Sequence, residues 1–208
     1  MSIIILTLGI LLSLFLYWRR LKEDYSSEIV FKSFFGMLLS GAIGSLIFKM
    51  ISSRIGSVFY FNPNELWFWG AFLGFVVSCL WITRKLDLVF FEIFEAALVS
   101  FILIFGFVFF NYAVENHEAF SLIVFLFVLA LVALFFFLDK KYKTFSWYKS
   151  GKVGFAGIFC SSLFFLARSV VAITVPNVIS FVGRIDSLIS VSIAFILFFI
   201  IYNLATKI

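Results

Sequence analysis

Long apolar stretches alternate with short polar connections along the whole chain of 208 residues. A membrane-spanning helix needs about 20 predominantly apolar residues. Seven stretches fit this requirement approximately: Ser2–Tyr17, Ser33–Ile51, Leu66–Thr83, Leu88–Val114, Ala119–Leu138, Val153–Thr174 and Leu188–Ala205. Both prolines, Pro63 and Pro176, fall in connections, where helix breakers belong. The pattern predicts an all-α polytopic membrane protein, in which a single domain forms a bundle of seven transmembrane helices.

The basic residues give this bundle an orientation. The first, third and fifth connections and the C-terminus together hold twelve of the 16 Lys and Arg residues. The other side holds only three, Lys49, Arg54 and Arg184. Because basic loops remain in the cytoplasm, the sequence predicts an N-terminus outside and a C-terminus inside. This uneven distribution of basic residues also supports the count of seven spans, since a missed span would place the basic connections on both sides.

The composition excludes a water-soluble fold. Hydrophobic residues make up 64% of the chain and charged residues 13%, with a mean hydropathy of +1.18, whereas a soluble domain is about one quarter charged. The net charge of +5 does not indicate a nucleic-acid partner, because the charges fall at helix ends and in short loops. The first stretch has no basic residues before it and no small-residue cleavage site after it, so we expect a retained helix and not a signal peptide.

Candidate chemistry is sparse. Cys79 and Cys160 lie inside apolar stretches without metal-ligand spacing, which indicates buried packing residues. There is no phosphate-binding glycine loop, no HExxH sequence and no nucleophile elbow. We therefore expect neither a metal nor a cofactor. His117, the only histidine, lies in a short connection and is interpreted as a solvated loop residue.

Ionisable residues inside a span are costly and are functional candidates by default. Arg168 lies in the sixth stretch, where it either faces an interior or headgroup pocket or extends its long side chain to the outer interface. Glu92 and Glu95 share one face of the fourth stretch. They either complement the helix N-terminus beside Arg84 and Lys85, or Glu95 pairs with a cation from another helix.

Small residues recur at intervals of four. Gly36, Ser40 and Gly44 follow this spacing in the second stretch, and Gly70 and Gly74 follow it in the third. Such spacing allows the backbones of two membrane helices to approach closely. The sequence therefore predicts close helix packing at these positions.

Several segments, taken in order, resemble the prolipoprotein diacylglyceryl transferases, bacterial inner-membrane enzymes with seven spans. The segments are Tyr17–Lys22, Gly41–Gly44, Leu66–Gly74, Phe91–Glu95 and Ser150–Phe155 followed by Phe164–Ala172. The resemblance implies transfer of a diacylglyceryl group from phosphatidylglycerol to a lipobox cysteine. It also implies a phosphatidylglycerol-like phospholipid and a prolipoprotein signal peptide as partners, and a location in the bacterial inner membrane.

The resemblance assigns roles to a few side chains. Arg168 matches a family arginine, and with Gly70 and Gly74 it is expected to contact lipid. Glu92, Glu95 and His117 are expected to give polar support. Trp69, Phe164 and Ala172 stand where the family has His, Tyr and Glu. Three functions stay open: a divergent transferase, a non-catalytic lipid- or protein-binding scaffold, and a small transporter or channel subunit.

Overall fold

Seven α-helices and one short 3-10 helix make up the fold in the computed structural model, which describes residues 2–59, 66–145, 148, 154–175, 181 and 183–206. For residues 52–59 and 143 only the backbone is described. The helices are α1 (Ser2–Leu21), α2 (Ser27–Phe59), α3 (Trp67–Lys85), α4 (Phe90–Asn116), α5 (Ala119–Lys141), η2 (Tyr142–Thr144), α6 (Phe155–Thr174) and α7 (Arg184–Thr206). All seven α-helices are long and apolar enough to cross a membrane. The predicted all-α seven-helix bundle is therefore confirmed.

The apolar pattern located every span but not every helix end. The α2 helix begins at Ser27, six residues before the predicted stretch, and this polar extension contains the exposed (i, i+4) ion pair between Glu28 and Lys32 at 2.5 Å. Its 33 residues correspond to a length of about 50 Å. The hydrocarbon core is only about 30 Å thick. Residues 60–65, which include Pro63, and residues 176–180, which include Pro176, lie outside the described part of the chain.

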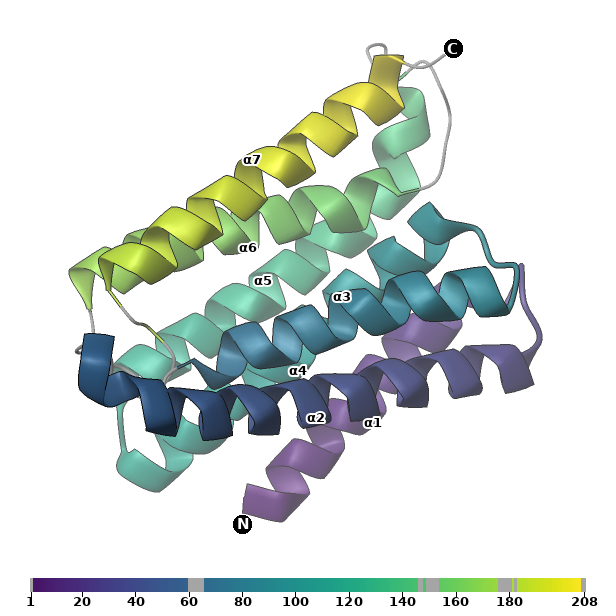
Figure 1. The fold of residues 1–208 in the computed structure, drawn as a ribbon. Helices are drawn as coiled ribbons and strands as arrows, with labels where there is room; N and C mark the ends of the chain where they lie inside the picture. The colour runs from purple at the N-terminus through teal and green to yellow at the C-terminus, as the bar shows by residue number, and fades with distance from the viewer. Residues whose placement is uncertain are drawn as a thin grey trace.

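The α4 helix forms the centre of the bundle. It packs against α1, α3, α5 and α6, while α2 pairs with α3 and α6 pairs with α7 (Figure 1). In its most apolar 18-residue window, 83% of the α4 residues are buried, compared with 17% for α2 and 22% for α1. The helix is apolar on all sides, as a helix enclosed by others must be. Most potential sites in the bundle therefore have α4 as one wall.

The contact between α2 and α3 depends on glycine. A Cβ atom added to Gly44 would collide with the carbonyl oxygen of Gly70, and one added to Gly74 would collide with the carbonyl oxygen of Ser40. The prediction of close helix packing is thus confirmed. Beside Gly70 lie the Gly44 carbonyl and the Phe48 side chain, and beside Gly74 lies the α2 backbone at Ser40 and Gly41, so both glycines have a packing role. Their expected contact with lipid stays a prediction.

The charged ends of α1, α3 and α5 lie at one end of the bundle, which we name the basic end after Arg19, Arg20, Arg84, Lys85, Lys140 and Lys141. The left-handed residues Asp87 (φ 50°) and His117 (φ 55°) mark tight turns before and after α4. By the charge rule, the basic end is the expected cytoplasmic end.

The glycine contact gives a testable prediction. Gly74→Val should destabilise the protein by about 1–3 kcal/mol, because the added atoms force α2 and α3 apart. The measurement is thermal unfolding of the purified protein in detergent. Leu73→Val, at the exposed neighbouring position, is the control and should melt close to wild type. Equal melting of the two variants would contradict the close contact.

Candidate functional site

A buried ion pair joins α6 to α7. The α6 helix positions Arg168, and the first turn of α7 positions Asp186, so that Nη2 lies 2.8 Å from Oδ2. The two side chains are 1% and 0% exposed. Ser190, one turn further along α7, donates a hydrogen bond of 3.3 Å to the second carboxylate oxygen, Oδ1. The location of Asp186 at a helix N-terminus also favours its negative charge.

Aromatic rings enclose the guanidinium group of Arg168. Its Cζ atom lies 3.7 Å from the ring centroid of Phe68, 4.8 Å from that of Phe181, 5.4 Å from that of Trp69 and 5.6 Å from that of Phe105. Ring faces attract a cation and exclude water from it. Arg168 therefore faces the protein interior, and the alternative in which it reaches the outer interface is wrong.

A cavity of about 220 Å³ borders this ion pair between α4, α5 and α6. Apart from Arg168, the described residues of its lining are apolar and include Phe120, Phe127 and Phe164. The charge of Arg168 is already balanced by Asp186. An incoming phosphate would have to displace both this carboxylate and the covering rings. The arrangement therefore suits a structural cation better than a phosphate-binding one.

A second buried carboxylate, Glu95, links four helices near the basic end. It is 1% exposed, pairs with Arg20 of α1 at 3.1 Å, and accepts a hydrogen bond of 2.7 Å from the backbone N–H of Gly157 in α6. Arg20 also lies 3.7 Å from Asp139 of α5. The interpretation in which Glu95 pairs with a cation from another helix is confirmed. Beside this cluster, burial raises the pKa of Tyr142 to about 12, so its hydroxyl stays neutral at physiological pH.

Glu92 and His117 have local roles. Glu92 accepts a hydrogen bond of 2.8 Å from the hydroxyl of Tyr25, which in turn accepts one from the backbone N–H of Val89. Burial raises the pKa of Tyr25, which keeps this donor protonated. His117 is exposed and ends α4 in the left-handed conformation, where His is enriched. This matches the interpretation of His117 as a loop residue.

The expected polar groups are not gathered around Arg168. Glu95 binds Gly157 at the start of α6, and Arg168 lies eleven residues further along. A helix rises 1.5 Å per residue, so the two sites are about 17 Å apart along α6. Glu92 lies nearly one turn before Glu95, further towards the basic end. The described residues thus form two separate charged clusters and not one catalytic constellation.

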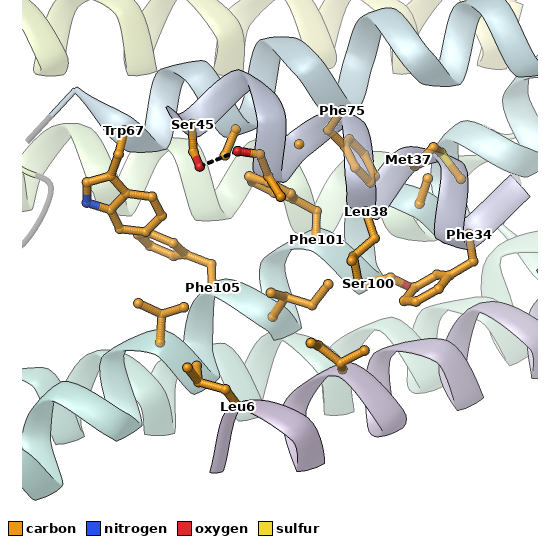
Figure 2. Close-up of a pocket in the computed structure, with 17 residues that line it drawn as sticks. Leu6, Phe34, Met37, Leu38, Ser45, Trp67, Phe75, Ser100, Phe101 and Phe105 are labelled. Atoms are coloured by element: carbon orange, nitrogen blue, oxygen red, sulfur yellow. Dashed lines mark hydrogen bonds between the residues drawn. The ribbon is translucent and has the colours of Figure 1, made fainter. Parts of the chain in front are cut away.

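An apolar groove lies between α1, α2, α3 and α4, with a volume of about 450 Å³. Figure 2 shows Leu6 from below and Leu38, Phe75 and Trp67 from above gathered around an open space. The rings of Phe34, Phe101 and Phe105 line it as well. The hydroxyl groups of its two serines already form hydrogen bonds to backbone carbonyl oxygens. Ser45 donates to Ala42, and Ser100 donates to Ser13 and Ala96.

Asp186 is the functional-site residue that sequence reasoning missed. It is the only acidic residue after Asp139, and it follows Arg168 by 18 positions, at the start of the next helix. A lone carboxylate facing a lone intramembrane arginine across one connection is a usable signal. The groove has no such signal, since its lining residues differ little from other apolar positions.

The Arg168–Asp186 pair gives a prediction on stability. Asp186→Asn should cost about 3–5 kcal/mol, because it leaves a buried cation without its counter-ion. The double variant Arg168→Met/Asp186→Leu should recover much of this loss, because both charges leave together. Thermal unfolding in detergent measures both.

The control is the exposed pair of α2. Glu28→Gln removes a carboxylate from an ion pair whose side chains are 67% and 75% exposed, and such pairs contribute little. Its melting temperature should match that of wild type. If Asp186→Asn also melts like wild type, the ion pair does not hold α6 to α7.

Comparisons with known proteins give no match: no protein-family model matches the chain, nor does any curated protein or any solved structure. The resemblance to prolipoprotein diacylglyceryl transferases therefore stays a prediction. The fold, the charged clusters, the groove and the cavities are the features that bear on function.

Proposed function

We propose that the protein is a non-catalytic, lipid-binding membrane protein, in which the groove between α1, α2, α3 and α4 holds an acyl chain of a phospholipid. The observation that carries the proposal is the groove itself, about 450 Å³ in volume and lined almost wholly by apolar side chains of four spanning helices. Ligand pockets generally have volumes of about 300–1,000 Å³. Hydrocarbon is the material that surrounds these helices.

The lining favours an acyl chain over a partner helix. Membrane helices pack through small residues that allow close backbone approach, as α2 and α3 do. The groove instead presents the large rings of Phe34, Phe101 and Phe105, with Trp67 at one end. A flexible chain adapts to such an irregular surface, whereas a rigid helix leaves gaps between the rings.

The hydroxyl groups favour an acyl chain over a headgroup. Ser45 and Ser100 already donate to backbone carbonyls. Among the described residues, no charged side chain lines the groove. A phosphate there would lie without counter-charge in a medium of low dielectric constant, which is strongly unfavourable. The groove therefore suits the tail of a lipid.

The other functions have less support. Diacylglyceryl transfer requires a cation near the leaving phosphate, but Arg168 is paired with Asp186 and covered by Phe68. Only the sequence resemblance supports a lipobox peptide as a partner. Transporters commonly contain discontinuous helices, whereas the seven spans in the described ranges are continuous. The bacterial inner membrane is the location that the resemblance implies, and it is part of the proposal.

Acyl-chain photolabelling tests the groove. The purified protein, in nanodiscs that contain a phospholipid with a diazirine in its tail, should be labelled at Ser100 and Phe101. Ala42→Phe places a ring at the exposed rim of the groove, and it should reduce this labelling roughly tenfold by steric exclusion. Mass spectrometry of the peptides gives the labelled positions.

The neighbouring residue supplies the control. Ile43 is 56% exposed and lies outside the groove lining, so Ile43→Phe should leave the labelling unchanged. Phe199 of α7, which is 65% exposed, reports ordinary lipid contact. A dedicated site would be contradicted if the groove residues were labelled to the same extent as Phe199 and if Ala42→Phe left their labelling unchanged.

An activity assay tests the non-catalytic part of the proposal. Purified protein incubated with phosphatidylglycerol and a lipobox peptide should give no lipidated peptide above a protein-free blank, because Arg168 offers no free charge to the phosphate. Thioether formation detected by mass spectrometry in excess of the blank would contradict the proposal and support the transferase reading.

A further inference from the structure

A different cavity opens at the basic end, between the last turns of α1 and α5, with a volume of about 310 Å³. The α1 helix contributes cations and an apolar base, and α5 contributes aromatic rings and a further cation. The lining residues are Leu16, Arg19, Arg20, Lys22, Glu23, Phe135, Phe136, Asp139 and Lys140. In the part of the chain that the structure describes, this cavity shares no lining residue with the apolar groove.

The inner wall of this cavity is electrostatically satisfied. Arg20 is 18% exposed and pairs with Glu95 and Asp139, at 3.1 Å and 3.7 Å. Burial and the two carboxylates tie this arginine into the bundle. It is therefore a fixed part of the wall and is not available as the main partner of a ligand.

Three further cations surround the opening. Arg19, Lys22 and Lys140 are exposed, and within the described ranges none of them forms an ion pair. Among the described residues of the lining, Glu23 and Asp139 are the acidic ones. Rings hold two of the cations in place: the Arg19 guanidinium lies 4.9 Å from the centroid of Phe136, and the Lys22 amine lies 5.2 Å from that of Trp18.

We propose that this cavity binds the headgroup of an anionic phospholipid. The phosphate would lie between Arg19, Lys22 and Lys140, whose charges it offsets. Basic pockets between spanning helices are suited to anionic headgroups, and arginine can bind phosphate through two parallel hydrogen bonds. The apolar base formed by Leu16 and Phe135 receives the first carbons of the tails. This base favours a lipid over a free phosphate, which has no apolar part.

Headgroup competition tests the proposal. The protein is reconstituted in nanodiscs of equal parts phosphatidylglycerol and phosphatidylcholine with identical acyl chains, and the lipids that remain bound are counted by native mass spectrometry. Wild type should retain phosphatidylglycerol preferentially. Arg19→Gln/Lys140→Gln should lower this preference roughly thirtyfold, since each basic residue near an anionic surface contributes about a factor of five.

Arg84→Gln/Lys85→Gln removes two charges from the basic end of α3, outside this cavity, and it should keep the wild-type preference. An equal loss in this control, or no loss in the cavity variant, would overturn the proposal. Displacement of the lipid by millimolar glycerol phosphate would also overturn it. The identical acyl chains separate this result from the groove, and Ala42→Phe should retain the headgroup preference.

Discussion

The absence of water inside a bilayer is the constraint on which this structure depends. A charge buried there is tolerated only with a partner, and the bundle buries Arg168 and Glu95 almost completely. Arg168 is paired with Asp186, and Glu95 with Arg20 and the Gly157 N–H. Each partner comes from another helix. Pairing therefore fixes which helices must be neighbours, which hydrophobic contact alone does weakly in lipid.

The two charged clusters act on opposite parts of α6. Glu95 accepts a hydrogen bond from the first turns of α6 and Arg168 anchors its last turns to α7. The helix is thus held at two points about 17 Å apart along its axis, against α4 at one and α7 at the other. A site built for catalysis concentrates its polar groups in one place. In this bundle the polar groups lie at separate points and hold neighbouring helices together, which favours a scaffold over a catalytic site.

The sequence predicted what depends on apolar length and on small-residue spacing. The seven spans leave a local signal in their apolar length, and the glycines of α2 and α3 leave one in their spacing, although the spacing does not state that these two helices pair. The pairing of Glu95 with a cation from another helix was one of two alternatives that the sequence left open. The helical extension at Ser27 was not predicted, since hydropathy measures the apolar part and not the hydrogen-bonded one. Asp186 and the groove depend on which helices become neighbours, and a single sequence does not state that.

The position of α1 explains why two lipid-sized spaces exist in one bundle. It packs mainly on α4 and touches α2 much less (Figure 1). The α2 helix packs along α3 through the glycine contact. It therefore diverges from α1, and the apolar groove lies between α1 and α2. On the α5 side, the charged end of α1 is held by Arg20, so its remaining cations surround the second cavity. One helix, held by Arg20 to Glu95 and Asp139, thus borders both an apolar groove and a basic cavity.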